Sequence, residues 1–354
     1  MDLYSNKLYR EDIDLIASAD LPWIKLQNKS ILFSGATGLL GSFLVDVLMQ
    51  KNKDGLNCSI YALGRSKQKA IDRFSKWWGD SKLFFIQHDI NSSLIRDDIG
   101  DVDYVIHLAS NTHPVQYSTD PIGTIKTNIF GLQNMLDFAV THNSSRFAFA
   151  SSNEIYGENR GDVELFEEKY CGYIDSNTLR AGYPESKRCG EALCQAYKEQ
   201  KGLDVVIARF TRSYGPTMLL SDTKASSQFI LKGINEDDIV LKSLGNQYYS
   251  YTYMADAVYG LLTVLLSGEN GEAYNIADEK SNIRLRNLAQ IIADYTNKKV
   301  VFDIPNAIEA AGYSKATKAL LDGSKLKKLG WKPFYTIESG IVRTISVLKS
   351  IKSN

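Results

Sequence analysis

The sequence predicts a doubly wound, parallel α/β sheet followed by a smaller C-terminal lobe. A strand-like run and a helical run meet at a glycine-rich turn within residues 31–48, and runs of the two kinds alternate to about residue 210. A length of 354 residues is also long for one compact core. The candidate strands are 30–34, 58–63, 83–87, 103–108, 146–151 and 204–210. The helical patterns between them lie near 41–52, 67–77, 122–142 and 183–201.

The two ends of the chain fall outside this alternation. Residues 1–29 form an extension with a helix expected near 10–18, and acidic residues stand where a signal peptide would carry a basic region. After Tyr214-Gly215-Pro216 the elements become shorter, with one helical segment at 285–295. We expect a nucleotide-binding domain over residues 1–215, to which the segment 246–275 returns, and a substrate-binding lobe made mainly of residues 216–354.

The glycine-rich turn is the most informative stretch. It runs Ser34-Gly35-Ala36-Thr37-Gly38-Leu39-Leu40-Gly41 between an apolar run and a helical pattern. Glycines in such a turn let the backbone approach a pyrophosphate at the helix N-terminus, as in a Rossmann dinucleotide site. The candidate cofactor-binding residues here are Gly35, Thr37, Gly38, Leu39, Leu40 and Gly41.

Later strand ends supply further cofactor candidates. Arg65 follows the second strand, where an acidic residue normally binds the ribose hydroxyls of NAD. An arginine there could pair with a 2′-phosphate, so NADP stays open beside NAD. Asp89 and Ile90 follow the third strand, where they could meet the adenine. The residues closing the fourth strand, where backbone should line the cofactor, are Leu108, Ala109 and Ser110.

Composition excludes several other classes of partner. Lys+Arg and Asp+Glu both number 41, so the overall charge predicts neither nucleic acid nor a membrane surface as a partner. The four cysteines show no metal-like spacing, and no apolar run approaches the ~20 residues of a membrane span. We expect no metal ion, reduced thiols and a cytoplasmic location.

Residues with catalytic potential cluster around the fifth strand and the helix after it. Ser152 and Glu154 follow the strand, and Tyr183 and Lys187 lie one helical turn apart at the start of the helix. An ammonium beside a phenol stabilises the phenolate, so we expect the pKa of Tyr183 to fall toward neutrality. The same spacing recurs twice later in the chain, but only Tyr183 is expected near the carboxyl ends of the strands. It is therefore the candidate base for a hydroxyl proton.

These residues belong to an ordered set of motifs that covers almost the whole chain. The other members are Asn128-Ile129-Phe130-Gly131, Arg209 through Tyr214-Gly215-Pro216, Tyr253 with Ala255-Asp256, Tyr274-Asn275-Ile276 and Leu329-Gly330-Trp331-Lys332-Pro333. With this set the chain resembles the extended short-chain dehydrogenase/reductase superfamily, in its branch of nucleotide-sugar epimerases, dehydratases and decarboxylases. Within the branch, the stretches Arg180–Arg188 and Gly215–Met218 are most similar to the UDP-glucuronate decarboxylases.

The resemblance implies an enzyme that oxidises C4 of a nucleotide sugar with bound NAD. Tyr183 would take the proton of the 4-hydroxyl, Ser152 would hydrogen-bond the same oxygen, and Lys187 would hold the cofactor ribose. Glu154 would move a proton at C5, as in dehydratases and decarboxylases. Asn128 joins the cofactor-binding candidates.

The candidate substrate-binding residues include departures from the decarboxylase pattern. Tyr249 stands where the family has a diphosphate-binding arginine, Arg212 replaces the usual asparagine, and Lys224 replaces an arginine. Either cation could pair with phosphate or with a sugar carboxylate. Ala319, beside Lys318, also stands where decarboxylases usually carry an arginine. The full candidate set is Asn153, Arg180, Arg212, Lys224 and Tyr249.

Three hypotheses about function follow. The first is a decarboxylase that converts UDP-glucuronate to UDP-xylose, favoured by Asn153 in place of the aspartate frequent in 4,6-dehydratases. The second is an NDP-hexose 4,6-dehydratase, with an NDP-sugar 4-epimerase as the next alternative, and the third is a non-catalytic NAD(P)-sensing scaffold. The resemblance also implies a role in polysaccharide biosynthesis and a homodimer that pairs the segments near 125–140 and 183–200.

Overall fold

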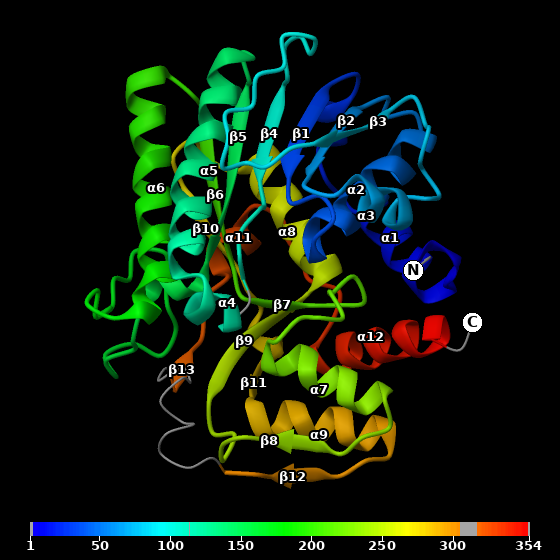
Figure 1. Ribbon diagram of the computed structural model, residues 1–354, viewed down its shortest axis with the longest axis vertical. Helices are drawn as coiled ribbons and strands as arrows, with labels where there is room; N and C mark the ends of the chain where they lie inside the picture. Colours follow the sequence, from blue (N-terminus) through cyan, green and yellow to red (C-terminus); the bar gives the residue numbers. More distant parts are fainter. Residues whose placement is uncertain (1–2, 113, 305–316, 353–354) are drawn as a thin grey trace.

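A seven-stranded sheet with only parallel neighbours forms the centre of the molecule (Figure 1). The computed structural model describes residues 3–112, 114–304 and 317–352. The strand order β10-β6-β5-β4-β1-β2-β3 reverses between β1 and β4, so their carboxyl ends form the switch point where doubly wound sheets bind ligands. The predicted fold class is confirmed. The strands are Ser30–Ser34 (β1), Ser59–Gly64 (β2), Leu83–Gln87 (β3), Tyr104–His107 (β4), Arg146–Ser152 (β5), Val205–Phe210 (β6) and Ala273–Ile276 (β10).

Two elements of this region differ from the prediction. The helix expected at 67–77 ends earlier, since α3 spans Lys67–Arg73 and turns follow it. Phe74 and Trp77 are buried and continue the apolar spacing of the helix beyond its end, which explains the overestimate. The seventh strand, β10, has only four residues and was not among the predicted strands.

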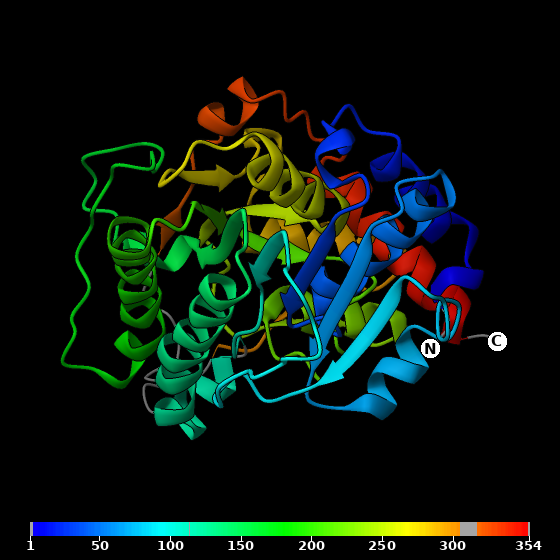
Figure 2. The ribbon, with the colours of Figure 1, turned by 90° about the horizontal axis from the view of Figure 1, so that it is seen from above.

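Helices cover both faces of the sheet (Figure 2). α5 and α6 lie side by side on one face, while α2 and α8 cover the other and α1 packs on both of them. Their bounds are Lys7–Ala17 (α1), Leu39–Lys53 (α2), Pro121–Thr141 (α5), Gly182–Lys201 (α6) and Met254–Ser267 (α8).

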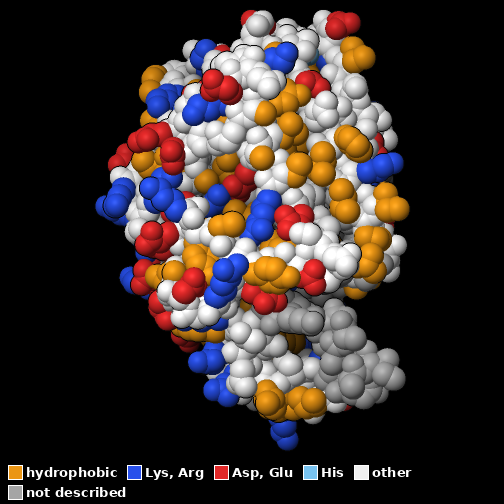
Figure 3. Space-filling view, turned by 90° about the vertical axis from the view of Figure 1, so that its left-hand side faces the viewer, with side chains coloured by type: hydrophobic (Ala, Val, Ile, Leu, Met, Phe, Trp, Pro, Cys, Tyr) orange, Lys and Arg blue, Asp and Glu red, His pale blue; other side chains and the backbone are white. Residues whose placement is uncertain are grey.

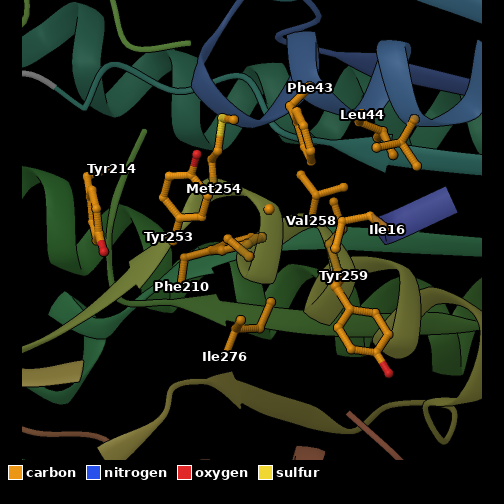
Figure 4. Packing of buried hydrophobic residues seen from close by; sticks show 14 of the residues in the cluster. Ile16, Phe43, Leu44, Phe210, Tyr214, Tyr253, Met254, Val258, Tyr259 and Ile276 are labelled. Carbon is orange, nitrogen blue, oxygen red and sulfur yellow. The ribbon is translucent and has the colours of Figure 1, made fainter. Parts of the chain in front are cut away.

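Burial on both faces explains why the strands are apolar at successive positions. Ile31 and Phe33 belong to the core under α2 and α8, whereas Leu32 between them belongs to the core under α5. Figure 4 shows the first core, with Phe43 of α2 and Val258 of α8 pointing toward one another.

The second lobe lies beyond the carboxyl edge of the central sheet (Figure 1). β9 is the middle of a four-stranded sheet and pairs with β7, β11 and β13, while β8 and β12 form a parallel pair. The helix expected at 285–295 is present as α9. The strands of this lobe are Arg212–Tyr214 (β7), Ile239–Leu241 (β8), Tyr248–Tyr253 (β9), Asn282–Arg284 (β11), Val300–Phe302 (β12) and Lys318–Ala319 (β13), and its helices are Ala225–Ile234 (α7), Leu285–Thr296 (α9) and Ile337–Lys352 (α12). Two short helices pack on the central domain instead: Pro114–Thr119 (α4) on α5, and Ser324–Lys328 (α11) on β10 and α8.

The N-terminal extension is fastened to the end of the chain. The helix expected near 10–18 is α1, and its buried Asp12 accepts hydrogen bonds from the hydroxyls of Tyr253 and Tyr335, both at 2.6 Å. Nε of Arg343 on α12 donates to the same carboxylate at 2.5 Å.

Among the helices of the described residues, none has the length and apolar character needed to span a membrane.

Candidate active site

The glycine turn between β1 and α2 leaves no room for side chains. Gly35 has a φ of 71°, and a Cβ on it would lie 2.9 Å from the amide nitrogen of Ala109. A Cβ on Gly41 would collide with the carbonyl oxygen of Gly35. α2 begins at Leu39 with Gly38 as its N-cap residue. Because glycine has no side chain, the first amide N–H groups of the helix have no side-chain cap. The geometry fits a backbone cradle for a pyrophosphate.

The loop after β4 is fixed against this turn. The hydroxyl of Ser34, at the end of β1, forms a 3.0 Å hydrogen bond with Nδ1 of His107 at the end of β4. It also accepts a hydrogen bond from the N–H of Ala109 at 3.1 Å. Leu108, Ala109 and Ser110 therefore lie beside the glycine turn, at the switch point.

The remaining cofactor candidates occupy different environments. The Arg65 and Asp89 side chains are exposed at the ends of β2 and β3, and Asp89 accepts hydrogen bonds from the backbone and side-chain N–H of Asn91. Ile90 is buried beneath α5, where it packs against Gly131. Thr37 and Leu40 are half-buried beside the turn.

A chain of hydrogen bonds links the loop after β4 to the start of α6. Ser110 Oγ donates to Asn128 Oδ1 at 2.7 Å, Asn128 Nδ2 donates to Ser186 Oγ at 2.9 Å, and Ser186 Oγ donates to the Tyr183 carbonyl at 2.8 Å. Asn128 is fully buried. Its amide thus holds together the two segments that carry Ser110 and Tyr183.

Tyr183 lies in the first turn of α6 and is 6% exposed. The hydroxyls of Ser152 and Ser110 lie near its phenol and act to lower its pKa. Its ring stacks on that of Tyr117, with 4.8 Å between the centroids, and the Arg180 guanidinium lies 4.9 Å from the centroid of the Tyr117 ring. Sequence reasoning missed Tyr117, because α4 has only six residues and no apolar periodicity to reveal it.

The ionisation of the Tyr–Lys pair differs from the prediction. Burial and the negative charge of Glu154 raise the pKa of Tyr183 to about 12. Burial also lowers the pKa of Lys187 to about 7, and its Nζ donates to the carbonyl of Ala150 at 2.8 Å, 6.0 Å from the centroid of the Tyr183 ring. The expected fall of the Tyr183 pKa is therefore wrong for this structure. Desolvation is the largest cause of both shifts.

A guanidinium–carboxylate pair lies beside the phenol. Glu154 belongs to the 3₁₀ turn after β5 and Arg180 to the 3₁₀ turn before α6. Nη2 of Arg180 donates to both carboxylate oxygens of Glu154, at 2.8 and 2.7 Å. Nη1 of Arg180 is buried and has no hydrogen-bond partner among the described residues. Both charges act on Tyr183, since Glu154 raises its pKa and Arg180 lowers it.

A second layer of polar residues supports the ends of β5 and β6. Glu191 of α6 accepts hydrogen bonds from Ser151 Oγ at 2.5 Å and from Nε and Nη2 of Arg209 at 2.9 and 2.6 Å. Nη1 of Arg209 donates to the hydroxyl of Tyr156 at 2.9 Å. Glu191 follows Lys187 by one helical turn, and this spacing was the signal that could have identified it.

Three substrate candidates lie apart from this cluster. The Arg212 guanidinium lies 3.5 Å from the ring centroid of Tyr249, and no hydrogen bond, ion pair or ring contact of the described residues joins Arg212 to Tyr183. Lys224 pairs with Asp222 at 3.1 Å, and its Nζ donates to Thr112 Oγ1 at 3.3 Å. The fourth candidate, Asn153, is buried directly after Ser152. Within the described ranges, no cluster of His, Cys, Asp or Glu could hold a metal ion.

The fold and the site together define a class of protein. A glycine turn at the switch point of a doubly wound sheet, with a buried tyrosine and lysine one helical turn apart beside it, characterises enzymes that use a nicotinamide dinucleotide. Residues 31–277 match the model of the NAD dependent epimerase/dehydratase family, and the chain belongs to this family. The resemblance found in the sequence is thus confirmed, and the chain is an enzyme.

Individual relatives agree with this assignment. UDP-glucuronic acid decarboxylases 5 and 6 of Arabidopsis thaliana are 30% and 31% identical over 316 residues, which cover 89% of this chain and 87% of each relative. UDP-glucuronic acid decarboxylase 1 of Xenopus tropicalis is 30% identical over 318 residues, covering 90% of this chain and 72% of the relative.

Solved structures share the fold. A dTDP-glucose 4,6-dehydratase from Streptomyces venezuelae, with NAD bound, has a TM-score of 0.79 at 23% identity and covers 92% of this chain and 98% of its own. A UDP-glucuronic acid 4-epimerase from Bacillus cereus, with UDP-glucuronic acid and NAD bound, has a TM-score of 0.78 at 20% identity and covers 91% and 99%. These structures come from both alternative reactions, so the fold does not choose among them.

Proposed function

We propose that the enzyme decarboxylates UDP-glucuronate and gives UDP-xylose. The observation that carries the proposal is the Arg180–Glu154 pair beside Tyr183. It adds a guanidinium, with one buried N–H group unpartnered, and a carboxylate to the apparatus for C4 oxidation. Simple 4-epimerisation requires neither group. In a uronic acid the sugar carboxylate can pair with the guanidinium of Arg180, and C5 can exchange a proton with the carboxylate of Glu154. The names of the 30% identical relatives support the same substrate.

In this mechanism Tyr183 removes the proton of the sugar 4-hydroxyl. Ser152 hydrogen-bonds the same oxygen, and the Lys187 ammonium stays close enough to favour the phenolate. The glycine turn and the loop at Leu108–Ser110 would hold NAD, which when bound supplies the hydride acceptor for C4 and returns the hydride at the end. Burial raises the Tyr183 pKa to about 12. Forming the phenolate that accepts the sugar proton therefore depends on the polar and charged groups around the phenol.

Arg180 and Glu154 act at the sugar carboxylate and at C5, the carbon next to C4. The guanidinium pairs with the sugar carboxylate and orients it, which releases Glu154 from its partner. Once C4 is a ketone, the C5–C6 bond breaks, CO2 leaves, and the bonding electron pair stays on C5 as an enolate. Glu154, freed from the guanidinium, takes a proton from water and delivers it to C5. Tyr183 finally gives its proton back to the C4 oxygen.

Product mass spectrometry tests the proposal. The purified enzyme with NAD is incubated separately with UDP-glucuronate and with a panel of NDP-hexoses, and loss of CO2 from the uronate is expected. Loss of water from a hexose would instead make it a 4,6-dehydratase with Glu154 as the C5 base. A product of unchanged mass but altered NMR couplings would make it a 4-epimerase.

The Tyr183→Phe variant tests the catalytic assignment. It keeps the ring that stacks on Tyr117 but loses the proton-transfer group. The rate should fall about 10²- to 10⁴-fold, with an unchanged unfolding midpoint. Full activity in this variant would refute the role given to Tyr183 and leave a cofactor-sensing scaffold as the better description.

NAD rather than NADP is the proposed cofactor. The family is described as NAD dependent, and the solved neighbours hold NAD. Arg65 is exposed at the end of β2, so its side chain could still reach a 2′-phosphate. Comparing the affinities of the protein for NAD and NADP decides the matter.

We also infer a homodimer that pairs α5 and α6 of two copies. Large hydrophobic side chains are exposed on α5 and just before α6, with exposed fractions of 69% for Ile122, 50% for Phe130 and 71% for Leu179. Figure 3 views the α6 side of the molecule, where hydrophobic side chains lie among charged ones of both signs. Burial of such side chains against a second copy would stabilise the pair.

A further inference from the structure

Arg212 differs from the other arginines that are at least partly buried in the described chain. Each of the others donates to a carboxylate or a carbonyl oxygen. For Arg212 the structure gives no such acceptor, and its Nη1 is buried without a hydrogen-bond partner. Burying a cationic N–H group without an acceptor is costly, so this position indicates a missing anion.

The ring of Tyr249 holds the guanidinium in place. β7 and β9 run parallel with Arg212 opposite Tyr251, and the side chain reaches back to Tyr249, two residues earlier on β9. The guanidinium carbon lies 3.5 Å from the centroid of that ring. A guanidinium stacked through its face keeps its N–H groups in the plane, where they can bind two oxygens of an anion.

The neighbouring strand offers no other cation for this task. Ala319 of β13 is paired with Tyr249 in the parallel register and is buried. Lys318 beside it forms an ion pair with Glu164 at 2.6 Å. Lys318 is thus already paired, whereas Arg212 has no acidic partner among the described residues. Arg284 on β11 is exposed and donates to the carbonyl oxygen of Asn246.

The position of Arg212 relates it to the catalytic residues. Phe210 pairs in register with Ser152 across β6 and β5, and Arg212 follows two residues later, beyond the carboxyl edge of the sheet. The charges of Arg180 and Glu154 shift the pKa of Tyr183, whereas the charge of Arg212 lowers the pKa of Tyr251. Arg180 is therefore the arginine beside the proposed base, whereas Arg212 lies in the small sheet beyond this edge.

We propose that Arg212, held on the ring of Tyr249, binds the diphosphate of the nucleotide-sugar substrate. The proposal rests on the proposed function for the substrate class, but not for the reaction or the sugar. It assigns the sugar carboxylate to Arg180 and the phosphates to Arg212. The two cations should therefore respond differently to truncated ligands.

Calorimetric titration of the NAD-loaded protein separates the two anions. The probes are uridine, UDP, UDP-glucose and UDP-glucuronate, and the variant is Arg212→Met. We expect about 10- to 100-fold weaker binding of all three diphosphates, the range for lost charge-assisted hydrogen bonds, and no change for uridine. Loss confined to UDP-glucuronate would overturn the proposal in favour of a carboxylate site, and unchanged affinities would overturn it altogether.

Two further variants guard against misreading a structural defect. Arg284→Met is a matched control, because Arg284 lies over the ring of the adjacent Tyr248 at 5.3 Å but is exposed, and it should leave UDP affinity unchanged. Arg212→Lys keeps a cation at this position without the planar guanidinium, and it should recover part of the affinity that Arg212→Met loses. Failure to recover any would count against the proposal.

The same titrations separate this proposal from the proposed function. If the wild-type protein binds dTDP and not UDP, the assigned substrate is wrong, and the Arg212 comparison is then made with dTDP. If UDP-glucuronate binds but is not decarboxylated, the reaction is wrong while the diphosphate assignment stands on the affinities.

Discussion

Lys187 is the most constrained residue of the site, because its ammonium is buried without an acidic partner. It is 2% exposed and donates to a single backbone carbonyl, while its charge lies 4.8 Å from the ring centroid of Phe149. Burial therefore lowers its pKa to about 7, against a usual lysine value near 10.4. The folded protein therefore bears the desolvation cost of an ammonium that lies between the end of β5 and the ring of Tyr183.

This burial predicts a pH dependence of stability. Between pH 7 and about 10 the unfolded chain holds a proton that folded Lys187 has released, so its contribution makes the free energy of unfolding rise with pH. Lys187→Met removes the contribution, and the difference between wild type and variant in urea denaturation should grow in favour of wild type from pH 7 to pH 9.

The exposed Lys201 at the end of the same helix supplies the control. Lys201→Met should show no such trend, because this ammonium is in contact with water in the folded and in the unfolded chain alike. A flat difference for Lys187→Met would contradict its burial as a desolvated amine.

At the scale of elements, the sequence predicted those whose signals are local. Six of the seven strands of the central sheet were found because buried parallel strands are continuous apolar runs, and the glycine turn because its backbone excludes side chains. What could not be predicted depends on contacts across the chain. The stack of Tyr117 on Tyr183 and that of Arg212 on Tyr249 join elements that no periodicity relates. Nor did spacing reveal that desolvation would move the Lys187 and Tyr183 pKa values apart.

The joint between α1 and α12 gives a prediction at this scale. Asp12 is fully buried and binds Tyr253, Tyr335 and Arg343 together, so its removal takes the acceptor from two hydroxyls and one of the acceptors from a half-buried guanidinium. Asp12→Ala should lower the free energy of unfolding by about 3–5 kcal/mol. Denaturant titration measures the loss.

Glu11 provides a matched comparison on the same helix. It binds the same Arg343 at 2.9 Å, but its side chain is 46% exposed. Glu11→Ala should therefore cost under about 1 kcal/mol. Equal losses for the two variants would show that α1 is not held by the buried carboxylate.

At the scale of the whole molecule, the distribution of charge and apolar surface bears on the proposed homodimer. The charges balance at 41 of each sign, and both signs are interspersed over the face in Figure 3. Such a surface offers no steering field for a polyanion. The exposed hydrophobic side chains of α5 remain to be covered.

A dimer through α5 and α6 makes a direct prediction for mass in solution. Light scattering at micromolar concentration should give twice the mass of the chain for the wild type. Phe130→Asp places a carboxylate in the proposed interface and should give the single-chain mass, because the charge would be buried without a partner. Phe302→Asp on β12 is the control, since that ring is exposed to the same degree, 52% against 50%, but lies in the other lobe. A monomeric wild type would refute the dimer. A dimeric Phe130→Asp variant would show that the interface lies away from Phe130 on α5. Neither result would change the proposed catalytic mechanism, because all the site residues named above belong to one chain.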